Sequence, residues 1–525
     1  MSSSLSASYD SEHTLKVLSF NVWGLAFISK DRKDRIRAIA EHLASSSYDI
    51  VCLQELWVYK DYEIVREEVQ SNLPFSRFFH TGALGSGLAI FTRFPLIAAH
   101  AFPYSLSGSP AQGFAGDFFV KKAAANVVIL HPVMGEVEIW NTHMDFAEER
   151  PPDTRQAHRI TQSWQLANAI RGGAAKGRYI LVMGDFNSQP WSVPIAMMKN
   201  HAHLVDSYLS VHPSANDEIS SPPTPDEAIK RYGMTCDSPL NSYSSGKRIP
   251  EHVLAKGGKR LDYIFYRQPA IARERPLMWR YQKAVKGDQK NRTTFGEPGG
   301  HLESGKPLEE SVSKAPILKC IDSQVIFTDN VPGRSFSYSD HYALFSTFTI
   351  EEPDESTGIR KRTDIPSDQT HPSSSVPLIP TISEAGPEQV NTDMYAARDP
   401  FKNQHLRDQS RASMSSSHKL TTIRSALNTI HLYTRLSKQT SKRHLRICAV
   451  LIIVLVCLTV GSAWQPKSWL QPIFTIVGGL LGAAAVSFLY TGYIWGRWEE
   501  GLLTEVTEEM ELELKVTEMV DNIST

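Results

Sequence analysis

The sequence predicts an α/β domain followed by a pair of membrane-spanning helices. Between Leu15 and Phe348 short β-type runs alternate with helical stretches, which is typical of a mixed α/β core. Near the C-terminus, two apolar runs without charged residues approach the ~20 residues that a helix needs to cross a bilayer. The length of 525 residues leaves room for one large core with appendages.

Buried strands are expected wherever a short apolar run is bounded by polar residues. In chain order, these runs are residues 15–23, 49–56, 87–92, 127–130, 136–142, 179–183, 261–267 and 324–328. Ile36, Ile39 and Leu43 recur at three- and four-residue spacing and predict a helix with one apolar face between the first two strands. Another helix is expected over residues 154–170.

Composition shifts divide the chain into segments. Residues 1–14 are polar and Ser-rich, without the apolar core of a signal peptide, and are expected to be disordered. The predicted catalytic domain covers residues 15–350, with the Gly-rich stretch 287–314 as a flexible surface insertion. Pro, Ser, Thr and charge dominate residues 351–420, which predicts a disordered linker. Residues 496–525 form an acidic tail that suits a solvated or partner-binding helix.

Two transmembrane helices are expected at residues 447–464 and 473–495. The alternative is a pair of buried core helices. The connection of eight residues predicts a hairpin with both flanks on one side of the membrane. Under the positive-inside rule, basic residues crowded before the first span place that side, and the catalytic domain, in the cytosol. These residues are Arg435, Lys438, Lys442, Arg443 and Arg446.

Residues 421–446 read as a basic amphipathic segment. Ile423, Leu427 and Ile430 form a helical stripe that continues to Thr434, interleaved with basic residues such as Arg424. Such a segment should lie at the bilayer interface and favour anionic lipids, at ~1 kcal/mol per basic residue. An equally open interpretation is a plain positive-inside flank.

Charge and cysteine usage exclude some classes of function. Lys and Arg total 55 against 56 Asp and Glu, so no broad field attracts a polyanion, and nucleic acid is not an expected partner. The five cysteines are widely scattered and form no CxxC pair. This argues against a zinc site or a disulfide framework and suits a reducing compartment.

Polar side chains follow several of the predicted strands. They are Asn21, Glu55, His143, Asp185, Asn187, Asp262, Asp340 and His341. One such residue alone is as easily a turn or a helix cap. Repeated in order, the pattern delivers carboxylates, amides and imidazoles to one rim of the core, which suits metal-assisted hydrolysis.

The motifs that carry these residues resemble the endonuclease/exonuclease/phosphatase, or DNase I-like, superfamily. They are SFNVWG, CLQELW, NTHMD, MGDFNSQP, RLDYIFY and SYSDHYAL, and they extend the resemblance from about Lys16 to Phe348. The resemblance implies a four-layer α/β sandwich, in which helices flank two β-sheets. With the two spans, the expected fold is this sandwich followed by a C-terminal two-helix transmembrane hairpin.

Two further segments are similar to one branch of that superfamily. GSGLAIFTRFPL at residues 85–96 and AGDFFVKKAA at residues 115–124 resemble neutral sphingomyelinases and the fungal inositol phosphosphingolipid phospholipases C. The pair of C-terminal spans is similar to the fungal enzymes. Trp23 stands where broader superfamily members often carry an acidic residue. That departure is shared with the sphingomyelinase branch and argues against a nuclease.

The expected cofactor is Mg²⁺, which prefers hard oxygen ligands and needs only one or two carboxylates against a phosphate. Glu55 is the primary candidate ligand, with Asn21 assisting. Asp340 is expected close to the metal, and whether it binds directly or through water is open.

A histidine is the best candidate for the base that activates water, because its pKa lies near neutrality. His341 is that candidate, and the resemblance implies that Asp262 orients its imidazole. It also implies that Asp185 and Asn187 position the water and the phosphate. His143 is expected to donate to the phosphoryl oxygens.

Asp117 and Lys122 are expected to form a switch pair. In the resembling enzymes such an acid and lysine pair controls the substrate loop. The alternative is an exposed pair on a surface loop, and Lys121 beside Lys122 leaves the register of the lysine open.

The sequence therefore predicts an integral membrane phospholipase C that hydrolyses sphingolipid phosphodiesters to ceramide and a phosphorylated head group. The resemblance implies activation by anionic phospholipids. The endoplasmic reticulum or a mitochondrial membrane is the expected location, and choline and inositol head groups both remain open. The alternatives are an inositol polyphosphate phosphatase or nuclease of the same superfamily, or a catalytically inactive membrane scaffold.

Overall fold

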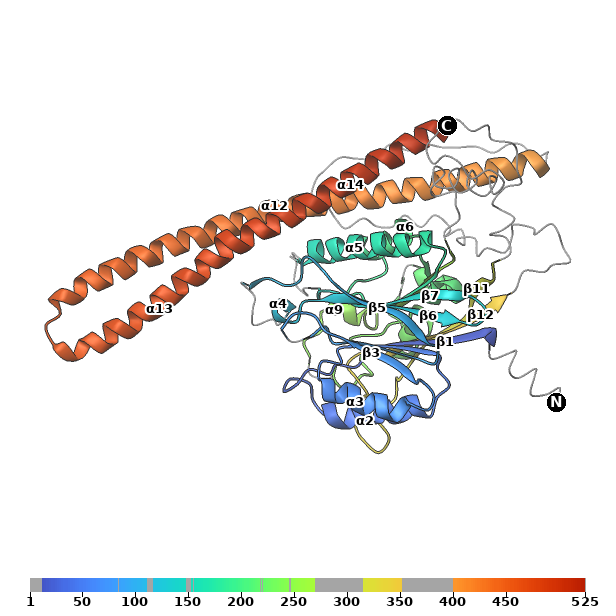
Figure 1. Cartoon of the computed structure of the whole chain (residues 1–525), viewed down its shortest axis with the longest axis horizontal. Helices are drawn as coiled ribbons and strands as arrows, with labels where there is room; N and C mark the ends of the chain where they lie inside the picture. Colours follow the sequence, from blue (N-terminus) through green and yellow to red (C-terminus); the bar gives the residue numbers. More distant parts are fainter. Residues whose placement is uncertain are drawn as a thin grey trace, which may run out of the picture.

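The computed structural model describes residues 12–83, 85–110, 117–147, 153, 155–217, 219, 221–244, 247–269, 315–351 and 400–524. The predicted insertion at 287–314 and most of the predicted N-terminal and linker segments lie outside these residues. Within them, two six-stranded sheets pack face to face, with helices on both outer sides (Figure 1). This confirms the predicted four-layer α/β sandwich.

The first sheet has the strand order β11-β12-β1-β2-β4-β3. Its strands are β1 (Thr14–Asn21), β2 (Ile50–Gln54), β3 (Phe75–Phe79), β4 (Leu88–Thr92), β11 (Ile317–Ile326) and β12 (Ala343–Glu351). The second sheet has the order β5-β6-β7-β8-β10-β9. Its strands are β5 (Leu96–Pro103), β6 (Ala123–His131), β7 (Gly135–His143), β8 (Tyr179–Asp185), β9 (Val205–Asp206) and β10 (Asp262–Arg267).

Helices cover the outer face of each sheet. The first sheet is covered by α2 (Arg32–Ala44) and α3 (Tyr59–Val69), the second by α5 (Gln156–Ala175) and α6 (Val193–Asn200) (Figure 1). Ile36, Ile39 and Leu43 are buried, as their spacing predicts. Short helices in the connections are α4 (Asp117–Val120), α7 (Ser207–Val211), α8 (Pro225–Tyr232) and α9 (Glu251–Leu254), with a 3₁₀ turn at Pro213–Asn216.

The sequence analysis did not find strands β3, β5, β9 and β12. Strand β5 lies at a sheet edge with several partly exposed residues, and β9 has only two residues. These strands therefore lack the continuous apolar run that marks a central strand. Strand β12 begins within the last predicted motif, at Ala343, and pairs with β1 and β11.

The C-terminal helices form a long hairpin that projects from one side of the sandwich (Figure 1). It consists of α12 (Pro400–Gly461), α13 (Gln471–Leu489), a π-helical segment (Tyr490–Trp495) and α14 (Gly496–Ser524), with 3₁₀ turns at Ser462–Trp464 and Ser468–Leu470. Within the part of the chain that the structure describes, two helices are long and apolar enough to cross a membrane, and only 6% of each apolar window is buried. Core helices of a soluble domain would be mostly buried, so the exposure favours membrane spans.

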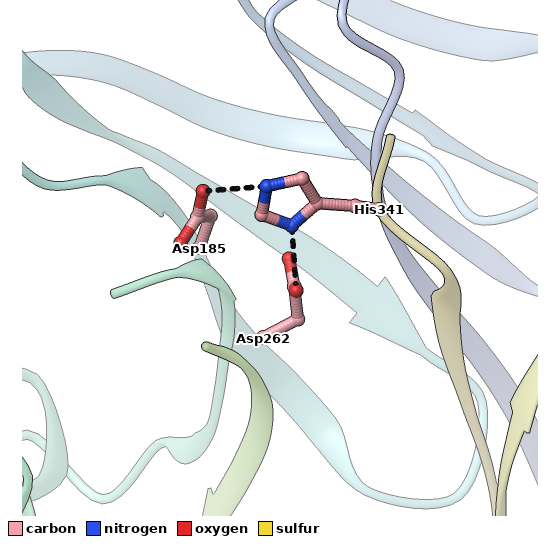
Figure 2. A group of neighbouring side chains, drawn as sticks. All are labelled: Asp185, Asp262 and His341. Carbon is pink, nitrogen blue, oxygen red and sulfur yellow. Dashed lines mark hydrogen bonds and ion pairs between the residues drawn. The ribbon is translucent and has the colours of Figure 1, made fainter. Parts of the chain in front are cut away.

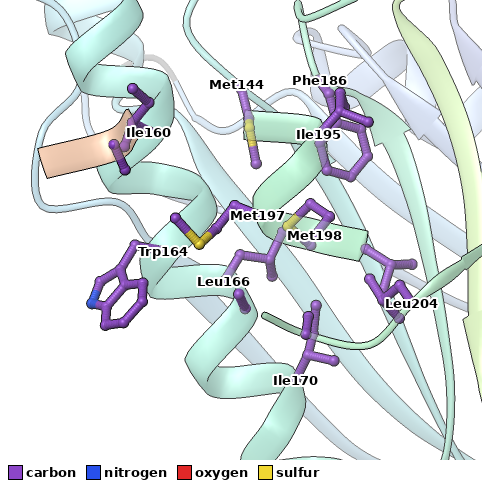
Figure 3. Close-up of a cluster of buried hydrophobic side chains, with 14 of the residues drawn as sticks. Met144, Ile160, Trp164, Leu166, Ile170, Phe186, Ile195, Met197, Met198 and Leu204 are labelled. Carbon is purple, nitrogen blue, oxygen red and sulfur yellow. The ribbon is translucent and has the colours of Figure 1, made fainter. Parts of the chain in front are cut away.

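The hairpin is packed against the catalytic domain, which the sequence analysis did not foresee. Ile423, Leu427 and Ile430 of α12 are buried in one core with α5 and α6, joined by Leu503 and Met510 of α14. Figure 3 shows the α5 and α6 side of this core, including Ile160, Trp164 and Met198.

Two expectations about this region need correction. The predicted linker (351–420) ends in helix, because α12 begins at Pro400. The apolar stripe expected at the bilayer interface faces protein, because α5 offers it a buried apolar surface. Both ends of the hairpin are thereby fixed to the sandwich.

Candidate active site

The two sheets present the functional side chains at a single rim. Strands β1 and β2 are parallel, as are β7 and β8, so their carboxyl ends lie at the same edge. Strands β10 and β12 run antiparallel to β8 and β1, so their first residues lie at that edge too. This topology brings together the ends of six strands that are far apart in the sequence.

Asn21 joins two carboxylates at the centre of the rim. Its Nδ2 donates to Glu55 Oε1 at 3.1 Å and to Asp185 Oδ2 at 3.0 Å. Burial raises the pKa of Glu55, and burial together with the charge of Asp262 raises the pKa of Asp185 to about 7. A bound cation would therefore stabilise two carboxylates held this close in a buried site.

His341 lies between two aspartates (Figure 2). Its Nδ1 donates to Asp262 Oδ2 at 2.9 Å, and its Nε2 lies 3.9 Å from Asp185 Oδ2. Burial alone would lower the pKa of His341, but the neighbouring Cys236, Asp262 and Asp185 raise it well above its usual value. The Asp262 bond fixes the ring, so Nε2 faces the rim.

His143 and Lys122 lie together beside the carboxylates of Glu55 and Asp185. His143 Nε2 lies 3.7 Å from Glu55 Oε1 and 3.6 Å from Asp185 Oδ2, and Lys122 Nζ lies 2.8 Å from the same ring nitrogen. Burial and the charge of Lys122 lower the pKa of His143 well below its usual value. A neutral imidazole and a cationic amine thus face the same carboxylates.

The backbone is strained at two of the site residues of the rim. Glu55 and Asn187 have φ of 57° and 48°, in the left-handed region that side chains other than glycine rarely adopt. Gly184, directly before Asp185, has φ 145°, and a Cβ there would lie 2.0 Å from the Thr142 carbonyl oxygen. Only glycine permits this close approach of β8 to β7.

The donor set fits a hard divalent cation. Among the described residues, Glu55 Oε2 and Asp340 Oδ1 are buried without a hydrogen-bond partner. Oxygen atoms of this kind are the ligands that Mg²⁺ prefers. Ligand atoms of Asp185, Asp262 and His341 also lie within 4.8 Å of one another, but Asp262 is engaged with the imidazole. Glu55 is therefore the stronger candidate ligand.

Comparison with known proteins agrees with this geometry. The model of the endonuclease/exonuclease/phosphatase family matches residues 18–341, which contain the whole rim. The chain belongs to this family. It is 31% identical to the inositol phosphosphingolipids phospholipase C of Schizosaccharomyces pombe over 512 residues, covering 95% of this chain and 94% of the relative.

Two other relatives cover less of the chain. The inositol phosphosphingolipids phospholipase C of Saccharomyces cerevisiae is 27% identical and covers 68% of each chain. Human sphingomyelin phosphodiesterase 2 is 29% identical, and the match covers 48% of this chain and 56% of the relative.

Most of the predicted site residues of this family member meet at the rim. Asn187 donates its backbone N–H to Asp185 Oδ1 at 2.8 Å and its side-chain amide to the Met144 carbonyl. Asp340 lies at the margin, where Lys247 Nζ is 3.1 Å from its Oδ2. In contrast, the side chain of Asp117 lies outside the described residues, so the predicted switch pair stays a prediction.

The structure distinguishes the two adjacent lysines. Lys122 is buried beside His143, whereas Lys121 Nζ lies over the ring of Trp498 at 5.4 Å from its centroid. Lys122 is therefore the lysine of the site, and Lys121 faces the C-terminal helices.

Sequence analysis missed two residues that support the rim. Arg35 is buried and donates to the carbonyls of Val22, Trp23 and Tyr338, which fixes the loop after Asn21. Its place inside α2 gives no local signal of this role. Lys247 lies in a connection without strand or helix periodicity, so no pattern indicates that it meets Asp340.

Proposed function

We propose that the chain is a Mg²⁺-dependent phospholipase C that hydrolyses sphingolipid phosphodiesters and releases ceramide and a phosphorylated head group. The observation that carries the proposal is the rim of Asn21, Glu55, His143, Asp185 and His341 in a chain that aligns over nearly its full length with an inositol phosphosphingolipids phospholipase C. Inositol phosphosphingolipid and sphingomyelin are both within the proposal.

His341 serves as the base in this proposal. Its Nε2 faces the rim, and Asp262 holds the ring in the tautomer that can accept a proton there. A water molecule gives its proton to Nε2 while its oxygen attacks phosphorus, and the phosphorus–oxygen bond to ceramide breaks. The leaving ceramide oxygen takes up a proton from solvent, and the His341 imidazolium releases its proton to solvent, which regenerates the base. Asp185 and Asn187 orient the water and the phosphate.

Positive and polar groups stabilise the negative charge on the phosphoryl oxygens. His143 lies beside Glu55 and Asp185 with Lys122 next to it, where both can donate to the nonbridging oxygens. Glu55, assisted by Asn21 and with Asp340 nearby, would hold Mg²⁺. The bound ion would polarise a phosphoryl oxygen and offset the carboxylates that raise the pKa of His341.

Apolar residues beside the rim support a substrate embedded in a bilayer. Phe27 and Ile28 are exposed by 107% and 69% in the loop that follows β1. This loop lies on the side of the sandwich from which the hairpin projects (Figure 1). Exposed apolar side chains on that side of the sandwich suit a lipid phosphodiester better than a soluble nucleic acid.

The proposed orientation places the catalytic domain in the cytosol, on an endoplasmic reticulum or mitochondrial membrane. All five cysteines are free, which suits a reducing compartment. Lys442, Arg443 and Arg446 are exposed directly before the first span, where they would contact anionic phospholipids as activators.

Product analysis tests the proposed function. The full chain in detergent is incubated with Mg²⁺ and, separately, with inositol phosphosphingolipid, sphingomyelin, a phosphoinositide and DNA. We expect ceramide with inositol phosphate or choline phosphate by mass spectrometry, and at least about a hundredfold less of both from a His341→Ala protein purified in parallel. Inorganic phosphate from the phosphoinositide, or nucleotides from DNA, without ceramide would overturn the proposal in favour of another family activity.

A further inference from the structure

A buried carboxylate connects the end of the second span to the catalytic domain. Glu499 is 6% exposed and lies four residues after Trp495, the last residue of the π-helical segment. It accepts hydrogen bonds from Tyr433 at 2.8 Å and from Ser437, both on α12. His158 Nε2 of α5 lies 3.2 Å from Glu499 Oε1, the oxygen that Tyr433 also contacts. One side chain thus joins both arms of the hairpin to the sandwich.

His158 also contacts a second carboxylate, that of Asp145. Its Nδ1 lies 3.1 Å from Asp145 Oδ2, so each ring nitrogen faces an acid. Burial would lower the pKa of His158, but hydrogen bonds to Asp145 and Glu499 raise it to about 9. The three residues, named here the Glu499–His158–Asp145 bridge, form a buried charged chain that none of the proposed catalytic steps uses.

The bridge ends at the segment that holds Lys122. Asp145 Oδ2 accepts the backbone N–H of Gly108 at 3.0 Å, and the neighbouring Ser107 Oγ accepts the backbone N–H of Lys122 at 2.8 Å. Asp145 also lies two residues after His143, the imidazole that Lys122 contacts.

A second set of contacts joins the same two regions. Phe118 packs edge-on against Trp495, with ring centroids 5.4 Å apart, and Lys121 lies over Trp498. The segment from Phe118 to Lys122 therefore lies between the end of the second span and the active site. Any shift of α14 relative to α5 would move it.

We propose that Glu499 and His158 are positioning residues, which act through Asp145, Gly108 and Ser107 to hold Lys122 at the rim. The proposal deepens the proposed function and rests on it. Removing one member of a buried charged chain leaves the others unpaired, which a packed interface does not tolerate without movement. The membrane hairpin thereby becomes a structural part of the active site, and docking of the hairpin determines where the lysine lies.

The test compares two adjacent glutamates in the full chain. Glu499→Gln removes the bridge charge at nearly constant volume. Glu500→Gln is the matched control, because Glu500 pairs with Lys438 on the surface at 2.8 Å. Turnover is measured on detergent-dispersed sphingolipid over a range of concentrations. Hydrogen–deuterium exchange is measured for peptides covering residues 104–110 and 118–123.

We expect Glu499→Gln to lower kcat about tenfold to a hundredfold, the effect of misplacing a catalytic group, with KM within about twofold. Exchange should rise in both peptides, and Glu500→Gln should match wild type. His158→Gln should have the same effect, and the double variant should be no worse than either single change.

Two results would overturn the proposal. One is wild-type kcat and exchange in Glu499→Gln. The other is a loss of activity that only follows the folded fraction, with kcat per folded molecule unchanged, because that would make the bridge merely structural. If wild type releases no ceramide, the proposed function fails, while the exchange data still decide whether Glu499 holds the Lys122 segment.

Discussion

Glu55 at the rim and Glu499 at the hairpin junction are both largely buried carboxylates, but their surroundings differ. Glu55 keeps one oxygen without a hydrogen-bond partner among the described residues, and burial raises its pKa. Burial would also raise the pKa of Glu499, yet hydrogen bonds from His158, Ser437 and Tyr433 lower it. The rim carboxylate can therefore bind a ligand, whereas the junction carboxylate is already hydrogen-bonded to other residues of the chain.

The contrast shows how one fold accommodates two uses of a buried acid. An unsatisfied buried carboxylate destabilises the fold unless a cation binds, which is a common feature of functional sites. A fully bonded carboxylate fixes the arrangement of the helices around it. Substitutions at the two regions should therefore separate activity from stability.

The largest expected effect is at the base of the rim. His341→Ala should lower kcat by about 10²- to 10⁴-fold, the usual contribution of a positioned acid–base group. The melting temperature should stay close to that of wild type, because the substitution removes a reacting group rather than apolar core volume. Near-normal turnover would remove His341 from the mechanism.

The adjacent lysines sharpen the comparison at the boundary of the two regions. Lys122→Met should lower kcat about a hundredfold, because a cation beside the phosphoryl oxygens is lost, without changing the Mg²⁺ requirement. Lys121→Met should lower it less than about threefold, since it removes only a cation–π contact worth roughly 0.5–1 kcal/mol. Equal effects of the two changes on steady-state kinetics would contradict the assignment of Lys122.

Two isoleucines of α12 test whether the hairpin is part of the folded core. Ile430 is buried against α5 and α6, whereas Ile453 is exposed by 63% within the first span. Ile430→Ala should lower the free energy of unfolding of the catalytic domain by about 2–4 kcal/mol. Ile453→Ala should leave it unchanged. Equal stability of both variants in denaturant titrations would mean that the helices dock only weakly.

The bridge also predicts the pH dependence of stability. His158 faces Asp145, Glu499 and Tyr433, and its pKa rises from 6.5 unfolded to about 9 folded. A raised pKa contributes stability that is complete below pH 6.5 and is lost as the pH rises through about 9. Asp145, with its pKa lowered to about 2, contributes above pH 3.8 and loses this as the pH falls.

Thermal melting across this range checks the prediction. The melting temperature of wild type should fall from pH 6.5 to 9 by more than that of His158→Gln. Parallel curves for the two proteins would show that the His158 imidazole carries no charge in the bridge.

The rim could be predicted from the sequence because its signals are local. Asn21 and Asp185 end buried strands and Glu55 directly follows one, and strand ends meet wherever parallel strands are neighbours. The arrangement of the sheets then follows from the family motifs. The alternation of apolar runs also predicted most of the central strands. Edge strands such as β5 were not predicted, because they are partly exposed and lack a continuous apolar run.

The docking of the hairpin could not be predicted, because it depends on contacts between segments far apart in the chain. The stripe of Ile423, Leu427 and Ile430 looks the same whether it faces lipid or α5. Glu499 stands at the start of an acidic run that reads as solvated, and only the fold shows His158 beside it. Lys247 is missed for the same reason.

The difference between the two carboxylates is tested most directly by thermal melting of the full chain with increasing Mg²⁺. A ligand that binds only the folded state raises the melting temperature as its concentration rises. Wild type and Glu499→Gln should both be stabilised by Mg²⁺, whereas Glu55→Gln should melt at a temperature that Mg²⁺ does not change. A Mg²⁺-dependent increase in Glu55→Gln equal to that of wild type would contradict the account, because the rim carboxylate would then not be the one that holds the ion.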